Sequence, residues 1–416
     1  MALDSHGRRE LLSAFGIASI ASLTRGWPFV LKAGAETVPA GTGLESGSEY
    51  LIDPGLTYLN TASLGPTPRV VLDRTVEAWH LLESNPVRMS YENGAVHVAT
   101  DQVREKAAAF LGCTADALIL TRSTTDAMNH LALGTHLRPG DRVLTTNQEH
   151  EGGTHGWQYV ARRHGVAVDV LELPTSDHDA LSIVRRIAAA ITPATRIISV
   201  SHVLTSNGLR MPIAEIAALA RSQDILCVVD GAQAIGQIEV DVKKLECHAY
   251  AASGHKWLMG PKGTGFLYIS RDAAARMEPI QREAGNRYVS NSTGIGCLPL
   301  VIGLGAAIDL MTGRGMAAVE KRIRELRSHV LAGMQKIRKL RVVSPPDGTG
   351  ATALVACMLP DDVDSGVFHP MLREKHGVIV KRAEPRFFNG LRLSAHLFNT
   401  EEEIDRALDV IRAELG

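Results

Sequence analysis

Residues 253–269 read SGHKWLMGPKGTGFLYI and carry the strongest signal in this chain. Lys256 precedes a run of small and turn-forming residues that leads into the apolar segment 265–269. A short apolar segment bounded by turn residues indicates a buried strand. A lysine at the entrance of such a strand either extends its ammonium into water or is held in a pocket. Because burial lowers the pKa of a lysine and makes its amine nucleophilic, Lys256 is a candidate catalytic residue.

Short apolar segments alternate with helical patterns from about residue 115 onward. We expect strands over 117–120, 143–146, 167–171, 197–201 and 226–230, and helices over 125–134, 155–164, 179–190 and 212–222. This alternation predicts an α/β fold with a mostly parallel sheet covered on both faces. Ligands bind such sheets at the carboxyl ends of the strands, so functional side chains are expected just after each strand.

The second half of the chain predicts a smaller C-terminal domain. A long helical segment is expected over 299–340, and the Pro- and Gly-rich residues 345–350 would end it. Shorter strand and helix patterns follow, ending in a helix over 400–414. We therefore predict a large domain over 51–310, whose first part packs with the small domain, and a small α+β domain over 311–416.

Polar side chains stand at three of the expected strand ends. Thr124 and Thr125 follow the first strand, where hydroxyls and free N–H groups of a helix start bind phosphate or simply cap the helix. His150 follows the second strand and would stack on a flat ring, transfer a proton or lie in solvent. Asp230 closes a buried strand and would pair with a buried cation or begin a turn.

One ligand would use all of these groups together with Lys256. It would carry a phosphate, a flat aromatic ring, a cationic ring nitrogen and an electrophilic carbon. Pyridoxal phosphate has all four, and it is held by a lysine Schiff base with an acidic partner at the pyridinium nitrogen. The combination therefore predicts a pyridoxal-phosphate site.

The order and spacing of these motifs resemble the class V aminotransferases of pyridoxal-phosphate fold type I. The resemblance runs from Tyr58 to the C-terminal helix and rests on Asp230–Gln233, on Ser253–Lys256 and on the Gly-Pro-Lys-Gly-Thr-Gly that follows. That family includes cysteine desulfurases and isopenicillin N epimerase. The stretches Gly254–Leu258 and Leu391–Thr400 are most similar to the epimerase branch.

The resemblance implies a role for each matching residue. Lys256 would form the Schiff base and move the substrate proton, Asp230 would keep the ring nitrogen protonated, and His150 would stack on the ring. Residues that would contact the rest of the cofactor are Gln233 at the phenolic oxygen and Thr124, Thr125, Ser253 and His255 at the phosphate. Residues that would contact the substrate are Arg392 at the α-carboxylate and Asn60, Thr61 and Ala62 at the pocket edge, with Thr205 near the ring oxygen.

A site of this kind labilises the α-hydrogen of an amino acid, after which several reactions are open. We rank transamination first, epimerisation second and β-elimination by a lyase third. The loop 381–390 has no cysteine, which argues against desulfurase chemistry; its Arg382, Arg386, Phe387 and Phe388 are candidates for the side-chain pocket. A non-catalytic binding protein conflicts with the intact Lys256 and Arg392. A dinucleotide oxidoreductase would need a G-x-G-x-x-G after the first strand, which is missing.

The composition limits the classes of molecule that this protein is expected to bind. The net charge is −1, so nothing indicates a nucleic acid or an anionic membrane, and a small-molecule amino-acid substrate is expected. The five cysteines are scattered without a metal-like cluster, so we expect no disulfide framework and no metal. The resemblance implies a homodimer, in which residues 291–296 match the segment whose Gly-Thr reaches the phosphate site of a partner subunit. Here Thr293 precedes Gly294, which departs from the family's order.

The N-terminus resembles an export signal. Arg8 and Arg9 precede an apolar run over 11–23 that is too short to span a bilayer, and Ala33-Gly34-Ala35 follows. We predict a twin-arginine-type signal over 1–35, a linker over 36–50 and a periplasmic protein without a membrane span in the mature chain. The alternative is an ordinary amphipathic helix on a cytoplasmic protein.

Overall fold

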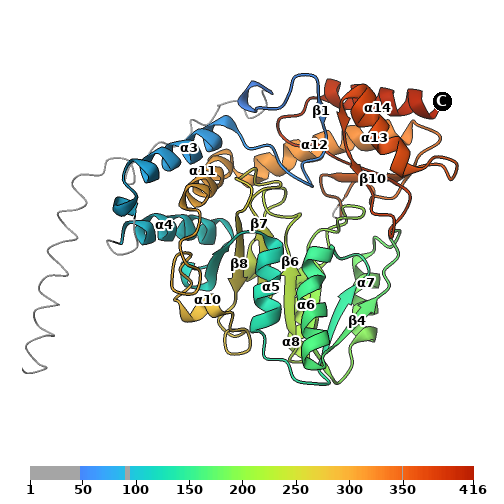
Figure 1. Ribbon diagram of the computed structural model, residues 1–416. Helices are drawn as coiled ribbons and strands as arrows, with labels where there is room; N and C mark the ends of the chain where they lie inside the picture. The colour runs from blue at the N-terminus through green and yellow to red at the C-terminus, as the bar shows by residue number, and fades with distance from the viewer. Residues whose placement is uncertain (1–46, 90–93, 349) are drawn as a thin grey trace, which may run out of the picture. The chain divides into compact units, whose positions relative to one another are not determined.

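A seven-stranded sheet lies at the centre of the computed structural model, which describes residues 47–89, 94–348 and 350–416 (Figure 1). The strands in spatial order are β2 (Leu118–Thr121), β8 (Gly265–Ile269), β7 (Ala249–Ser253), β6 (Leu226–Asp230), β5 (Thr195–Ser201), β3 (Arg142–Thr146) and β4 (Ala167–Leu171). Neighbouring strands are parallel except at β8, which is antiparallel to both β2 and β7. The predicted α/β fold with a mostly parallel sheet is confirmed.

Amphipathic helices pack on this sheet and bury its apolar side chains. Helix α5 (Thr124–Gly134) packs on β7 and β8, and α8 (Ile213–Ser222) packs on β6. Leu131 of α5 and Trp157 of α6 (Glu151–His164) share a buried core with Ile197 and Val228 of the sheet. The remaining helices before residue 298 are α3 (Arg69–Ser84), α4 (Ala95–Phe110), α7 (Ala180–Ala190), α9 (Val242–Leu245), α10 (Ile280–Glu283) and the 3₁₀ turns Gly47–Glu49, Pro86–Met89 and Ala115–Ala117.

The long helix expected over 299–340 is instead two helices. Helix α11 (Leu298–Arg314) ends at Gly315, and α12 (Met316–Gln335) leaves at an angle of 83°. Gly315 has φ = 78°, a left-handed conformation that favours glycine and ends a helix. Packing explains the bend, because α11 contacts α3 and α4, whereas α12 contacts β10 (Leu354–Met358) and α14 (Glu401–Leu415).

The C-terminal residues build a second, antiparallel sheet. Its order is β12 (Lys381–Arg382), β13 (Gly390–Ser394), β10 and β9 (Arg341–Val342). Leu326 of α12, Leu372 of α13 (Ser365–His376), Ile404 of α14, Val355 and Leu391 belong to one buried apolar cluster against this sheet. The predicted domain boundary at 310/311 remains a prediction.

The start of the described chain joins this C-terminal layer. Strand β1 (Thr57–Tyr58) pairs in parallel with β11 (Val378–Ile379), and Asn60 forms a bridge with Ser394. Gly65 N–H donates to the carbonyl of His255, which follows β7 of the central sheet. Residues 60–65 are therefore held at one end by the C-terminal sheet and at the other by the central sheet. The segment that follows β1 therefore reaches the loop that carries Lys256.

Among the described residues, no single helix is both long and apolar enough to cross a membrane, and α11 and α12 pass that test only as a bent pair. The predicted export signal over 1–35, and the linker up to residue 46, lie outside the described residues.

Candidate active site

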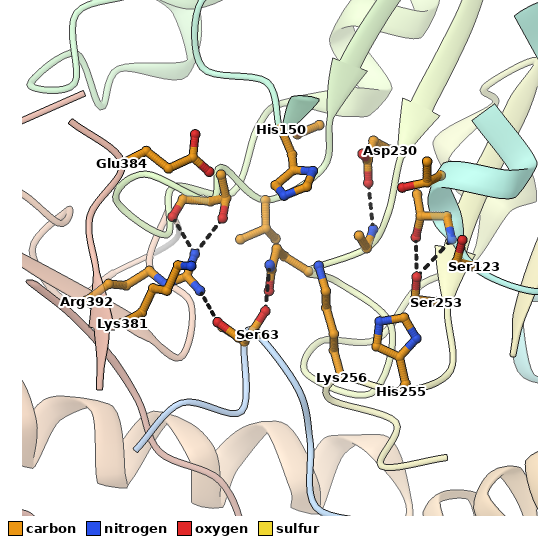
Figure 2. A pocket seen from close by; sticks show the side chains of 18 residues that line it. Ser63, Ser123, His150, Asp230, Ser253, His255, Lys256, Lys381, Glu384 and Arg392 are labelled. Atoms are coloured by element: carbon orange, nitrogen blue, oxygen red, sulfur yellow. Dashed lines mark hydrogen bonds between the residues drawn. The ribbon is translucent and has the colours of Figure 1, made fainter. Parts of the chain in front are cut away.

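A cavity of about 270 Å³ opens at the carboxyl ends of the central strands, where it meets the C-terminal layer (Figure 2). The sequence-predicted residues that line it together are Ala62, Thr124, Thr125, His150, Thr205, Asp230, Gln233, Ser253, His255, Lys256 and Arg392. Residues scattered over more than 300 positions of sequence thus share one space. Asn60 and Thr61 do not line it. Asn60 lies one contact away, where its Oδ1 accepts from the Ser63 hydroxyl at 2.7 Å.

Lys256 extends into the cavity from the loop after β7. Gly65 packs on its backbone so tightly that a Cβ at position 65 would come within 2.0 Å of the Lys256 carbonyl oxygen. Burial lowers the pKa of the Lys256 amine to about 8; the charge of Asp230 opposes this, and Arg392 and Lys381 add to it. A large fraction of Lys256 is therefore the neutral, nucleophilic amine near pH 8.

Asp230 ends β6 with a carboxylate that is only 6% exposed. Its Oδ1 accepts from the Ala232 N–H at 2.9 Å, and no cation lies within salt-bridge distance among the described residues. Burial raises the Asp230 pKa, whereas the Ala232 N–H and the charges of Lys256 and His150 lower it. A cationic ring nitrogen in the cavity would supply the partner that this carboxylate lacks.

The beginning of α5 forms a cradle for an anion. Ser123 caps the helix by accepting from the Asp126 N–H, and the Ser253 hydroxyl lies 2.8 Å from the Thr124 N and 2.7 Å from its Oγ1. His255 stands beside them with its pKa lowered to about 4 by burial, then by Lys256 and Lys262, so it is neutral and offers a hydrogen bond without charge. Hydroxyls and backbone N–H groups at a helix start fit a phosphate.

The orientation of the Gln233 amide is fixed by two neighbours. Trp257 Nε1, which can only donate, lies 2.8 Å from Oε1, and the Ala62 carbonyl, which can only accept, lies 3.0 Å from Nε2. Flipping the amide would place like groups against each other at both ends. Gln233 therefore has one amide N–H left, and it can offer the cavity a hydrogen-bond donor. Such a donor fits the phenolic oxygen of pyridoxal phosphate.

His150 enters the cavity from the side opposite Lys256 (Figure 2). It caps α6, and its Nδ1 accepts from the Gly152 N–H at 3.0 Å. Burial and the charge of Lys256 lower its pKa, so the ring is neutral with its proton on Nε2. This leaves a flat face and an Nε2–H donor toward the cavity.

Arg392 defines the far end of the cavity. It is 6% exposed, and its guanidinium donates to the Thr205 carbonyl at 2.9 Å, to Thr205 Oγ1 at 2.5 Å and to the Ser63 hydroxyl at 3.2 Å. Its Nε has no hydrogen-bond partner in the described structure. Burial lowers its pKa to about 10, although Glu384 opposes this. A ligand carboxylate would neutralise the charge and occupy free N–H groups.

Some lining residues were not predicted. They are Ser63, Ser123, Ser201, Val203, Ala232, Lys381 and Glu384. Ser123 and Ser201 could have been found, since each ends or follows a strand as Thr124 and Asp230 do. Lys381 and Glu384 lie on the loop that the sequence singled out, but the pattern emphasised the wrong members of that loop.

The four residues proposed from that loop do not line the main cavity. Arg386 lies over the Phe387 ring at 4.3 Å and donates to the Glu149 carbonyl at 2.6 Å, so it anchors the loop. Arg382 donates to the Ser365 hydroxyl at 3.0 Å, and Phe388 is buried with Ala356. Arg382 and Phe387 reach only a small adjoining hollow. These four side chains pack against the protein or anchor the loop, and Lys381 and Glu384 are the loop residues that line the main cavity.

The lining fits pyridoxal phosphate at each of its functional groups. The unpaired Asp230 carboxylate, the helix-start cradle, the oriented Gln233 amide and the nucleophilic Lys256 amine match the ring nitrogen, phosphate, phenolic oxygen and aldehyde, respectively. None of the five cysteines lines the cavity in the described structure.

Comparisons with known proteins agree with this fit. The model of the family "Aminotransferase class-V" matches residues 57–407. Isopenicillin N epimerase of Amycolatopsis lactamdurans is 32% identical, covering 87% of this chain and 96% of its own. A cysteine desulfurase of Serratia proteamaculans is 29% identical, covering 84% and 91%. A solved structure of a C-DES mutant with glycine covalently linked to the PLP cofactor has a TM-score of 0.77 at 24% identity, covering 86% and 96%.

Cavity, fold and sequence likeness thus lead to one conclusion: the chain belongs to the class V aminotransferase family of pyridoxal-phosphate enzymes, with the type I fold and pyridoxal phosphate as its cofactor.

Proposed function

We propose that this enzyme is an epimerase or racemase that inverts the α-carbon of an amino acid or of an amino-acid unit in a larger substrate. The observation that carries the proposal is the placement of His150 and Lys256 on opposite sides of the cavity. Inversion needs a proton to leave one face of the α-carbon and to return on the other. Two protonatable groups on opposite sides are suited to that task.

The residues divide the work by position. Pyridoxal phosphate, when bound, withdraws electrons from the α-carbon and makes its hydrogen acidic. Asp230 balances the charge of the ring nitrogen, and the Gln233 amide donates to the ring oxygen. Arg392 orients the substrate through its α-carboxylate. Lys256 Nζ takes the α-proton on its side. The imidazolium form of His150 delivers a proton from Nε2 on the other side, and forming that imidazolium breaks the contact between Gly152 N–H and Nδ1.

The relatives support inversion over the other reactions. The relatives with 31–32% identity are named isopenicillin N epimerases, whereas the cysteine desulfurases are 28–30% identical. The loop Lys381–Gly390 contributes Lys381 and Glu384 to the cavity instead of a cysteine, which disfavours sulfur transfer to the protein. Transamination, ranked first from the sequence, is not singled out by these relatives.

Transamination remains the second candidate because one observation favours it. With a pKa of about 8, the Lys256 amine can both accept and release a proton near neutral pH. A single base of this kind, on one side of the cavity, would be sufficient for transamination. Pyridoxal phosphate, when bound, would supply the capacity to carry the amino group to a 2-oxo acid.

The test is incubation of single enantiomers in D₂O, followed by chiral chromatography and mass spectrometry. We expect the antipode to accumulate with one deuterium at the α-carbon, without a 2-oxo acid co-substrate. His150→Gln should lose inversion while Lys256-dependent hydrogen exchange survives. Formation of a 2-oxo acid that depends on an added 2-oxo acid acceptor, while the remaining amino acid keeps its original configuration, would instead support transamination. Lys256→Ala is the control for the assigned base. It should lose both inversion and hydrogen exchange, and borohydride should no longer attach the cofactor to the protein.

Two further proposals concern the setting of the enzyme. We propose a homodimer, because exposed Ile280 and Ile295 line one surface hollow together with Ser290 and Gly294, near the expected partner contact. Light scattering at micromolar concentration tests the homodimer, and a monomer carrying full activity would refute it.

We also propose export through the Arg8-Arg9 signal. Cell fractionation with N-terminal sequencing tests this, and an unprocessed cytoplasmic protein would exclude it.

A further inference from the structure

Two cationic residues stand directly opposite each other at the substrate end of the cavity. Lys381 of β12 and Arg392 of β13 are register partners in an antiparallel pair, and both line the cavity. Directly opposite residues project from the same face of a sheet, with their Cβ atoms about 5 Å apart. Figure 2 shows the two side chains next to each other. Like charges in this arrangement destabilise a sheet, so the pair calls for a compensating group.

The described protein does not neutralise either charge. Arg392 donates only to neutral oxygens of Thr205 and Ser63, and its Nε is unpaired. Lys381 is exposed, and its ammonium makes no hydrogen bond or ion pair with a described residue. Glu384 shares the loop, but its carboxylate is 2.8 Å from Arg386 Nε and is engaged there. Two positive charges therefore remain at this end of the cavity.

The rest of the lining offers little apolar surface to a large apolar side chain. Its apolar members are the small residues Ala62, Val203 and Ala232. The neighbouring groups are hydroxyls and charges, which suit a polar ligand. One carboxylate can accept two parallel N–H bonds from the Arg392 guanidinium. The Lys381 ammonium would still have no anionic partner.

We propose that the cavity selects amino acids, or amino-acid units, with a second carboxylate: the α-carboxylate binds Arg392 and the second carboxylate binds Lys381. This inference rests on the proposal that the site takes an amino-acid substrate. Because the two residues are cross-strand neighbours, the second carboxylate lies close to the first, as in the side chains of aspartate, glutamate or 2-aminoadipate. Lys381 is thus a specificity-determining residue that plays no part in proton transfer.

A pair of matched ligands tests the proposal. Glutamate and glutamine have nearly the same shape but differ in the charge of the side-chain end. The holoenzyme is titrated with each, and the dissociation constant is read from the change in visible absorption of the bound cofactor, so turnover is not required. We expect glutamate to bind about tenfold more tightly than glutamine, the range for a partly exposed charged contact.

Variants show whether the preference comes from Lys381. Lys381→Met should bring the ratio of the two dissociation constants close to one, mainly by weakening glutamate binding. Lys321→Met, at an exposed lysine of α12, is the matched control and should keep the wild-type ratio. Lys381→Glu should go further and favour glutamine over glutamate.

The outcomes separate this inference from the proposed function. Equal affinities in the wild type, or a ratio that survives Lys381→Met, would overturn the inference alone. If Lys381→Met weakens both ligands equally, Lys381 shares the α-carboxylate with Arg392 and the second-carboxylate site is wrong. If no amino acid, acidic or neutral, perturbs the cofactor spectrum, the proposed function fails and this inference fails with it.

Discussion

Replacing Trp257 with phenylalanine should weaken the hold of the protein on the ring oxygen of its cofactor. Trp257 is fully buried, and its Nε1–H to Gln233 Oε1 contact of 2.8 Å is one of two bonds that orient the amide. In Trp257→Phe the amide keeps only its bond to the Ala62 carbonyl. The Gln233 oxygen then lacks a partner in a buried site, at a cost of about 1–3 kcal/mol, and the amide can rotate to recover one. Rotation would remove the donor that faces the cavity.

The magnitude can be measured by comparing two ligands. Pyridoxal phosphate has the ring oxygen, and 3-deoxypyridoxal phosphate lacks it. A hydrogen bond to a charged oxygen contributes about 1.5–3 kcal/mol, which is about 10- to 100-fold in the ratio of dissociation constants for the wild-type apoenzyme. We expect Trp257→Phe to reduce that ratio by at least about threefold. Intrinsic differences in aldehyde reactivity are common to all variants and cancel in the comparison.

A second buried tryptophan provides the control. Trp157 is also fully buried, and its Nε1 donates to the Ser199 hydroxyl at 3.0 Å, away from the cavity lining. Trp157→Phe loses an equivalent bond and a similar volume, so it should lower stability without changing the ligand ratio. Gln233→Ala sets the floor, because it removes the donor altogether. A Trp257→Phe ratio equal to that of the wild type, beside a reduced ratio in Gln233→Ala, would refute the argument that Trp257 orients the amide.

Three further outcomes follow from the structure. The rate at which the apoenzyme binds pyridoxal phosphate, measured by stopped-flow absorption, should be about tenfold higher at pH 9 than at pH 7, because burial lowers the Lys256 pKa to about 8. A rate that does not change with pH would contradict this pKa. Burial raises the pKa of Glu149 from 4.5 to about 7, so its contribution to the unfolding free energy falls by roughly 3 kcal/mol between pH 4 and 8. Glu149→Gln should remove this pH dependence from the unfolding free energies measured in urea titrations. An unchanged pH dependence in that variant would show that Glu149 is not its source. Gly231→Ala places a Cβ 2.1 Å from the Tyr250 ring and should cost about 3 kcal/mol; a wild-type urea midpoint would contradict the packing.

The part of the site that the sequence predicted follows from the geometry of parallel sheets. Thr124, Asp230 and Ser253 each end or follow a strand. Strands β2, β6 and β7 run in the same direction, so these ends lie at one edge of the sheet. Apolar patterning is sufficient to find the strands, so the polar residues after them can be grouped from the sequence alone. The same patterning extends a helix through Gly315, because one glycine inside a helical pattern is tolerated unless packing requires a left-handed turn.

The part that was missed depends on long-range register. Lys381 faces the cavity because β12 pairs with β13 and places it opposite Arg392, and no local pattern encodes that pairing. Ser63 reaches Arg392 because β1 pairs with β11, which lies more than 300 positions away in sequence. Arg386 was misjudged for the same reason. Its role depends on the Glu149 carbonyl, a partner from another layer.

Buried charges argue that this site is incomplete without its ligands. Asp230, Lys256 and Arg392 line one cavity, and none has an oppositely charged group within salt-bridge distance in the described structure. Burying an ionisable group without a partner is unfavourable, and each of their pKa values is displaced toward the neutral form by burial. A protonated ring nitrogen, an aldehyde and a substrate carboxylate would remove these three costs in turn. Cofactor and acidic substrate should therefore each raise the unfolding midpoint, and the second increment should vanish in an Arg392 variant while the first persists.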